Sequence, residues 1–324
     1  MNNHLDKLAH YTKALLFEDD YRLITQAIDG LHDVFSDLSG VTAGDITDKD
    51  IFLTSGKAIS TIKAAHCLRE FERTRRFLRG INKAIHHLLG QKTSGKINIL
   101  YAGCGPYATL LTPLTSRFTA EQLSFTLLDI NPDSLDAVRA LYESLGLLPY
   151  VKQFLLEDAI TYRVTAADDF DIMLSETMLN ALRKEPQVSI MANLIPQLKP
   201  GGLFIPQEIT VNAALLNSGQ EMASFFEAGK RPERMLVGTV YKSGIPMKYP
   251  EPVTLTMPPV TTHRRLALLT EINVYDNEKL GDYSCSLTLP YRLADLDTEK
   301  NYATVEFEYV IEENPHFSYN MVCY

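Results

Sequence analysis

The sequence predicts an α/β protein in which a helical region comes first, a doubly wound parallel sheet follows and an antiparallel β-rich domain comes last. Three observations predict this order. Up to about residue 95, apolar residues recur at helical spacing. Short apolar runs then alternate with helical segments, and after about residue 212 such runs follow one another with few helices between them. The expected regions are 1–95, 96–211 and 212–324.

The first region is predicted to be helical. Its stretches DDYRLITQAIDGLHDVF and ISTIKAAHCLREFERTRRFLRGINKAIHHLL carry apolar residues three and four positions apart, as a helix with one buried face requires. The stretch between them, SGVTAGDITDKD, is predicted to be a loop. We expect these helices to form a lid before the sheet.

The second region is predicted to form the parallel sheet. Its strand-length runs are INILYA, SFTLLDI, VKQFLL, FDIML and GLFIP. The segment NPDSLDAVRALYESLGL has helical period, begins at Asn131-Pro132 and reaches Gly146 near its end. Strands that alternate with helices predict a parallel sheet covered on both faces.

The third region is predicted to be antiparallel. Its strand candidates are VTLTM, RRLALLTEINVY, SCSLTLPY and ATVEFEYVI, with DNEKLGD and DLDTEK as the breaks.

The composition excludes several classes of function. The net charge of -9 and a pI near 5.4 argue against general affinity for nucleic acid or an anionic membrane. The four cysteines form no CxxC or CxxH pair, which predicts a reducing compartment and no metal site. The first residues contain no apolar signal segment, and no apolar run is long enough to span a membrane. These features predict a cytoplasmic protein.

A glycine-rich turn follows the first predicted strand of the sheet. Gly103, Gly105 and Ala108 stand in a G-x-G-x-x-A arrangement, which lets a ligand approach backbone N–H groups at a sharp turn. Asp129 ends the next strand, where a carboxylate can bind ribose hydroxyls. Asp158 and the Ala159 backbone follow the third strand and could meet an adenine edge, although Asp158 could equally cap a helix. Both a nicotinamide dinucleotide and S-adenosylmethionine fit such a crevice.

Two stretches favour S-adenosylmethionine. LYAGCGP and LIPQLKPGGLFIPQEITV resemble the corresponding segments of class I S-adenosylmethionine-dependent methyltransferases, with Tyr101 in place of their usual acidic residue and Tyr107 in place of a third glycine. The resemblance implies a Rossmann-like domain. The cofactor contacts that it implies are Arg73, Ala102, Gly103, Cys104, Gly105, Asp129, Ile130, Asp158, Ala159 and Glu176.

Within that superfamily, SETMLNALRKE resembles the double-glutamate loop of the protein arginine methyltransferases. It retains their Ser-Glu, a methionine two residues after that glutamate and a second glutamate nine residues on, at Glu176 and Glu185. Glu72-Arg73-Thr74 resembles their lid segment, whose arginine binds the cofactor carboxylate, and Thr262-His263 resembles their Thr-His-Trp loop. The resemblance implies a barrel-like β domain and catalytic roles for Glu176, Glu185 and His263, with His263 taking the released proton.

These observations predict an S-adenosyl-L-methionine-dependent N-methyltransferase that acts on an amine or guanidine of a small molecule or of an arginine-containing protein. Transfer of the aminocarboxypropyl group, a non-catalytic scaffold and an NAD-dependent oxidoreductase remain alternatives. A homodimer also remains open, because the segment from Ile209 to His263 is short for a dimerisation arm. Glu185 could simply begin a helix, Arg73 could lie on a solvated basic face, and His263 could be a surface residue.

Overall fold

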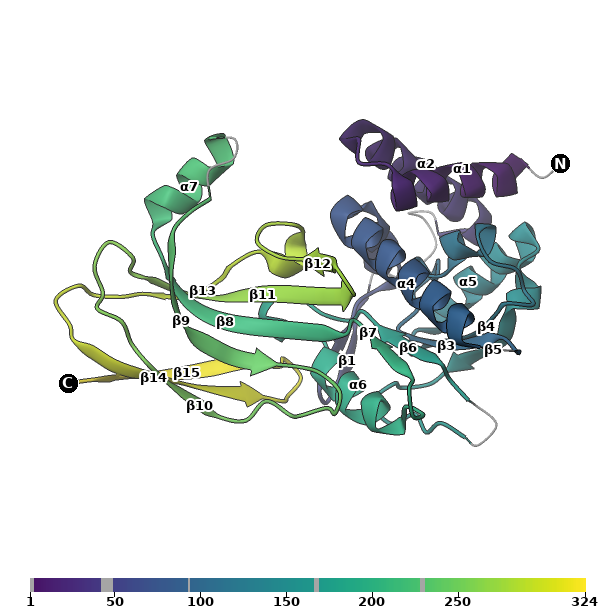
Figure 1. The fold of residues 1–324 in the computed structure, drawn as a ribbon. Coiled ribbons are helices and arrows are strands. Elements are labelled where there is room, and N and C mark those ends of the chain that lie inside the picture. The colour runs from purple at the N-terminus through teal and green to yellow at the C-terminus, as the bar shows by residue number, and fades with distance from the viewer. Residues whose placement is uncertain (1–2, 42–48, 93, 166–168, 228–230) are drawn as a thin grey trace.

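The computed structural model describes residues 3–41, 49–92, 94–165, 169–227 and 231–324. Helices come first, a parallel sheet with its helices follows, and antiparallel strands complete the chain (Figure 1). In Figure 1 the helices and the parallel sheet form one end of the molecule, and the antiparallel strands extend away from it. The helices of the first part are α1 Asn3–Phe17, α2 Tyr21–Ser39, α3 Thr61–His66 and α4 Phe71–Gln91.

Two features of this first part differ from the expectation. A two-stranded hairpin, β1 Ile51–Leu53 and β2 Gly56–Ala58, lies between α2 and α3. The helical run expected from residue 59 to 89 is also interrupted, because Glu70 has φ -78° and ψ 81° between a short 3-10 turn and α4. Neither a proline nor a glycine marks this interruption, and strands of three residues are too short to show a period.

The parallel sheet has the strand order β5-β4-β3-β6-β7. Because the chain proceeds outward in one direction from β3 to β5 and in the other from β6 to β7, the order reverses beside β3. In doubly wound sheets a crevice for ligands opens at the carboxyl ends of the strands at this point. The strands are β3 Ile97–Ala102, β4 Leu123–Asp129, β5 Val151–Leu156, β6 Ile172–Ser175 and β7 Leu203–Ile205.

The sequence also specifies the helices of this sheet. α5, Pro132–Leu145, begins after Asn131, whose side chain accepts the Asp133 N–H, and closes at Gly146 in the left-handed conformation with φ 71°. α6, Gln187–Leu194, follows the loop after β6. α4 joins the sheet to the β-rich part, because Gly80 lies so close to Val274 that an added Cβ would stand 2.6 Å from it.

The β-rich part contains two antiparallel sheets. In one, β12, β11, β8 and β9 are neighbours in that order and β13 also pairs with β11, whereas β10, β14 and β15 form the other. Gly238 on β9 leaves room for Leu255 on β10, where the two sheets meet. The strands are β8 Glu208–Leu216, β9 Arg234–Lys242, β10 Val253–Thr256, β11 Arg265–Tyr275, β12 Glu278–Leu280, β13 Tyr291–Asp295, β14 Tyr302–Val310 and β15 His316–Cys323.

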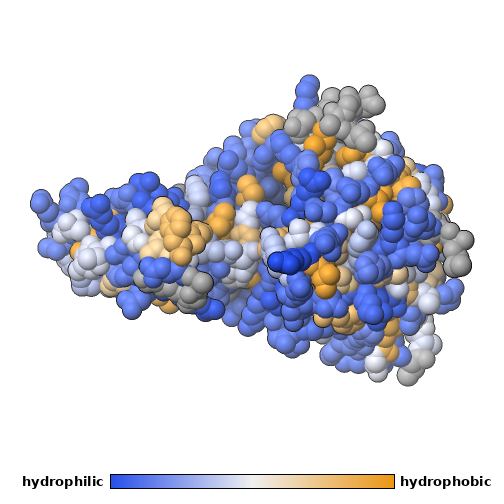
Figure 2. Space-filling view, turned by 90° about the horizontal axis from the view of Figure 1, so that it is seen from above, coloured by the Kyte–Doolittle hydropathy of each residue, from blue (hydrophilic) through white to orange (hydrophobic). Residues whose placement is uncertain are grey.

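One predicted strand of this part is wrong, and one helix was not expected. SCSLTLPY forms a 3-10 turn at Ser286–Thr288, and β13 begins only at Tyr291. Helix α7, Ser218–Phe226, projects from the strands (Figure 1) and exposes Phe225 and Phe226. Figure 2 shows a pale orange patch on the mostly blue and white arm of the molecule. Among the described residues no helix has both the length and the apolar character needed to cross a membrane.

Candidate active site

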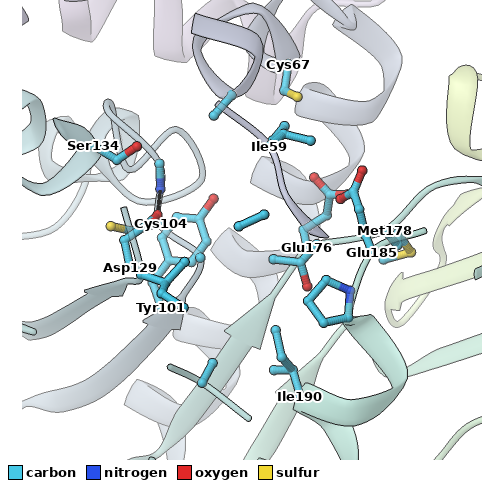
Figure 3. Close-up of a pocket in the computed structure, with 18 of the residues that line it drawn as sticks. Ile59, Cys67, Tyr101, Cys104, Asp129, Ser134, Glu176, Met178, Glu185 and Ile190 are labelled. Carbon is cyan, nitrogen blue, oxygen red and sulfur yellow. Dashed lines mark hydrogen bonds between the residues drawn. The ribbon is translucent and has the colours of Figure 1, made fainter. Parts of the chain in front are cut away.

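A cavity of about 330 Å³ opens at the carboxyl edge of the parallel sheet. The hairpin, α3 and α4 form one wall, the ends of β3, β4 and β5 form the floor, and the loop after β6 closes the far side. Figure 3 shows Tyr101, Cys104 and Asp129 on one side, with Glu176 and Glu185 on the other. The cavity therefore has two halves. The half that contains Tyr101, Cys104 and Asp129 is named the turn half, because the glycine turn after β3 lies there, and the half that contains Glu176 and Glu185 is named the acidic half.

The turn half is built on the glycine turn after β3. Gly103 and Gly105 have φ values of 74° and 64°, a left-handed conformation that favours glycine. The Gly103 and Cys104 N–H groups donate to the Leu128 carbonyl at 2.8 and 3.1 Å, which fixes the turn against β4. A Cβ on Gly103 would lie 2.5 Å from Thr177 Cγ2, so the turn accepts no side chain there.

Asp129 is tied directly to this turn. Its buried carboxylate accepts the Gly105 N–H at 2.8 Å and the Asn131 N–H at 2.9 Å. Burial raises the pKa of Asp129, and these backbone hydrogen bonds act in the opposite direction. Each carboxylate oxygen keeps a further lone pair, so Asp129 can still accept hydrogen bonds from ligand hydroxyls. Ile130 lines the same half of the cavity.

The segment after β5 closes this half. Asp158 and Ala159 line the cavity as expected, together with Glu157. Asp158 also accepts the Ile160 N–H at 2.9 Å, but residues 159–161 form a turn and not a helix, so Asp158 caps no helix. The Ala159 carbonyl accepts a hydrogen bond of 2.9 Å from Asn193, which anchors the segment to α6.

Arg73 connects the lid to the acidic half. Its guanidinium is almost completely buried, and its Nε and Nη2 both donate to Glu176 Oε2, with Nε at 2.8 Å. Its Nη1 lies 3.7 Å from Glu70 Oε2. The expected acidic neighbour, Glu72, bonds instead to Arg75 and Arg76. Residues three apart share a helix face and adjacent residues do not, so Glu70 faces the cavity and Glu72 does not.

The two glutamates predicted as catalytic are both buried in the cavity, and their carboxylates point toward one another (Figure 3). Burial raises the pKa of Glu176 to about 7, although Arg73 opposes this change. Burial and the charge of Glu176 raise the pKa of Glu185 to about 7. Because two guanidinium N–H groups bond to Glu176, Arg73 favours the ionised form of Glu176 more strongly than that of Glu185.

The acidic half also contains carboxylate oxygens that lack partners. Glu176 Oε1 and Glu70 Oε2 are buried and make no hydrogen bond within the described structure. A buried polar atom without a partner is costly. These two acceptors therefore favour a ligand that donates hydrogen bonds.

The loop that carries Glu185 is held by the β-rich part. Ala181, Leu182 and Lys184 all have positive φ, at 56°, 51° and 67°, which is unusual for residues with side chains. The Leu182 carbonyl accepts the Tyr309 hydroxyl at 2.6 Å, and the Lys184 N–H donates to the Pro315 carbonyl at 2.7 Å. The position of the acidic pair thus depends on the packing of the two parts of the chain.

His263 does not reach this cavity. It precedes β11, and its Nε2 lies 3.1 Å from the Glu233 carbonyl at the start of β9. β11 meets the acidic loop at Thr270, whose hydroxyl accepts the Ala181 N–H at 2.8 Å. β11 begins at Arg265, and the five residues of strand from there to Thr270 correspond to about 17 Å. His263 lies before Arg265, so the structure gives no geometric basis for proton transfer to His263.

Several polar cavity residues were not predicted, among them Lys57, Glu70 and Ser286. Glu70 could have been found from its spacing of three residues before Arg73. Nothing in the sequence marks Lys57, which lies on the hairpin, or Ser286, which lies in the 3-10 turn taken for a strand. Among the described residues, no group of three or more His, Cys, Asp or Glu side chains is arranged to hold a metal ion.

Solved structures show which fold this is. The Trypanosoma brucei PRMT1 enzyme–prozyme heterotetrameric complex with AdoHcy matches with a TM-score of 0.52 at 11% identity, over 79% of this chain and 92% of that chain. An open conformation of Arabidopsis thaliana protein arginine methyltransferase 10 gives a TM-score of 0.48 at 12% identity, over 72% and 84% of the two chains. No protein-family model and no curated protein sequence matches this chain. The predicted fold class is thereby confirmed: the chain has a Rossmann-like α/β domain, N-terminal helices and an antiparallel β-rich region, arranged as in the trypanosomal arginine methyltransferase structure.

Proposed function

We propose that this protein is an S-adenosyl-L-methionine-dependent methyltransferase that acts on a guanidine or amine nitrogen. The observation that carries the proposal is the meeting, in one cavity, of a glycine turn bonded to Asp129 and the buried pair Glu176 and Glu185. Neither half of the cavity alone would indicate this reaction. Their meeting supports a reaction between a nucleotide-borne group and a cation.

The turn half fits the nucleotide part of the cofactor. Gly103 and Gly105 form a sharp turn in the cavity wall, Asp129 offers acceptors to ribose hydroxyls, and Asp158 and Ala159 line the same half, where they would meet an adenine edge. Arg73 stands between the halves, where its remaining N–H groups can bind a carboxylate. When bound, S-adenosylmethionine supplies an electrophilic methyl group on a sulfonium, whose positive charge suits the carboxylates of this cavity.

The acidic half orients the acceptor. Glu176 and Glu185 can each accept charge-assisted hydrogen bonds from a guanidinium or ammonium group, each contributing on the order of 1.5–3 kcal/mol. Holding the nitrogen in line with the methyl carbon is the main catalytic contribution in such a displacement. Methylation by the bound cofactor would require the acceptor nitrogen to release a proton. Glu185, whose pKa is about 7, can accept it at neutral pH.

Two measurements test this proposal. Titration calorimetry should detect binding of S-adenosylmethionine and of its demethylated product AdoHcy, and the absence of binding would favour a non-catalytic scaffold. Incubation with labelled cofactor should then transfer label to an acceptor whose mass rises by one methyl group. A larger increase would indicate aminocarboxypropyl transfer instead. A homodimer remains a prediction, which sedimentation of the full chain tests.

A further inference from the structure

The hairpin between α2 and α3 covers the acidic half of the cavity. Together with its flanks it forms residues 49–60, named the strap below. Its Lys57 N–H donates to the Lys184 carbonyl at 2.8 Å, which attaches it to the loop that carries Glu185. A Cβ on Gly56 would stand 2.8 Å from the Pro186 nitrogen and 2.9 Å from the Glu185 carbonyl carbon. Backbone therefore packs directly on backbone above the second glutamate.

The strap is also fastened at its base. Asp50 accepts hydrogen bonds from Lys57 Nζ at 2.6 Å, Lys63 Nζ at 3.0 Å and the Ser60 N–H at 3.0 Å. Although burial opposes ionisation, these bonds hold the pKa of Asp50 at about 2, so the anchor stays charged at any physiological pH. Thr61 follows the last residue of the strap, and its hydroxyl is hydrogen-bonded to the Ser134 hydroxyl on α5 at 3.1 Å, which ties the start of α3 to the sheet.

The space under the strap is acidic and small. Glu70, Glu176 and Glu185 line the cavity with the buried guanidinium of Arg73, and Lys57 and Lys63 also line it but are both paired with Asp50. Glu70 Oε2 and Glu176 Oε1 make no hydrogen bond within the described residues. A donor-rich cation would satisfy both the charge and these oxygens. A cavity of about 330 Å³ lies at the lower end of the range for ligand pockets, and on the proposed function it must hold the cofactor as well.

The walls of this space define the rest of the ligand. Ile59 comes from the strap, Met178 from the loop after β6 and Ile190 from α6, and all three line the cavity (Figure 3). Such a surface fits a short carbon chain behind the charged group.

From this enclosure, and resting on the proposed function, we infer that the acceptor is a small free cation, a guanidine or amine on a short carbon chain, and that the strap excludes arginines held in a polypeptide. A free molecule can enter and be enclosed. An arginine within a chain carries backbone on both sides, and that backbone meets the strap at Gly56 and Lys57.

Calorimetry on the full chain tests this inference apart from activity. AdoHcy is titrated first, and its failure to bind would overturn the proposed function. With AdoHcy saturating, L-arginine, agmatine and putrescine are compared with a blocked Gly-Arg-Gly tripeptide. We expect at least one free cation to bind at least tenfold more tightly than the tripeptide, and Glu185→Gln to remove that binding. Equal or tighter binding of the tripeptide, or binding of none of the free cations to the AdoHcy complex, would overturn the inference and leave the proposed function standing.

A variant in which the strap is less firmly anchored provides a second test. Asp50→Asn removes the charge that anchors Lys57 and Lys63, so the preference for free cation over tripeptide should fall at least threefold. Asp136→Asn, at an exposed position on α5, is the matched control and should leave the preference unchanged. Should Asp50→Asn fail to fold, Lys63→Met removes one anchor from a half-exposed side chain and should shift the preference in the same direction. An unchanged preference in the folded strap variant would show that the strap does not select the acceptor.

Discussion

Replacing Glu185 by glutamine should make the protein more stable and less active. A carboxyl group whose pKa rises from 4.5 to about 7 on folding costs about 3 kcal/mol above pH 7, where it is ionised in both states. The groups that face it are Glu176 and Asp50, which raise its pKa, and Arg73 and Lys57, which lower it. Glutamine keeps the shape and removes the charge.

The sign of the effect follows from proton binding. Between pH 4.5 and about 7 the folded protein holds a proton that the unfolded chain releases, so wild-type stability falls as the pH rises through this window. The advantage of Glu185→Gln should therefore be small at pH 5 and should grow to about 2–3 kcal/mol at pH 8, after allowance for the buried amide. Turnover should fall at least a hundredfold, because one of the two charged acceptors is lost.

Urea denaturation from pH 5 to pH 8 checks this expectation, with methyl transfer measured on the same samples. Glu143→Gln, at an exposed position on α5, is the control and should show no pH-dependent difference from the wild type. The Glu185→Gln variant could prove less stable than the wild type at pH 8, or the difference in stability between the two could fail to change with pH. Either result would refute the assignment of a buried carboxylate that destabilises the fold when it is ionised.

Further predictions concern the turn, the arginine and the histidine. Gly103→Ala and Gly40→Ala both place alanine at positive φ, 74° and 72°; Gly40→Ala should cost about 1–2 kcal/mol of stability and Gly103→Ala more, because its Cβ would also meet Thr177, and only Gly103→Ala should abolish AdoHcy binding, measured by calorimetry. Arg73→Met should cost about 3–5 kcal/mol in urea denaturation, because it leaves buried carboxylates without their cation, whereas Arg292→Met at an exposed pair should cost less than about 1 kcal/mol. His263→Ala should leave turnover within about twofold, because the residue precedes β11, whose start is itself about 17 Å of strand from the contact between Thr270 and the acidic loop. Acceptor affinity in the presence of AdoHcy should rise with pH up to about 8, because only the ionised acidic pair binds a cation strongly.

The parallel sheet could be predicted from the sequence because its signals are local. INILYA and VKQFLL coincide with β3 and β5, and Asn131 and Gly146 punctuate α5 as expected. Buried parallel strands are continuous apolar runs, and helix ends carry their own capping residues. The turn and Asp129 follow directly from these elements, because the carboxyl ends of neighbouring parallel strands meet at one edge of the sheet.

The lid and the strap could not be predicted in the same way. Glu70 ends a turn without proline or glycine, and the hairpin strands have only three residues each, stabilised by contacts with the distant Glu185 loop and by Asp50. Tertiary contacts, not local propensity, determine both features. They are also what brings Glu70 and Lys57 to the cavity, so the least predictable segments complete the site.

The sequence placed His263 directly before a strand but did not determine which end of that strand lies near the cavity. The sequence indicated a strand at residues 264–275, and β11 forms there, but the end of the strand that approaches the cavity depends on pairing. β8 leaves the α/β part at Glu208 and pairs antiparallel with β11, so that Asn273 lies opposite Glu208 and Arg265 opposite Leu216. The start of β11, and His263 with it, must therefore lie at the far end of the sheet. The acid–base role then falls to a residue already in the cavity, and Glu185, which is buried there with a pKa of about 7, is the one whose position the strap and the β-rich part both hold.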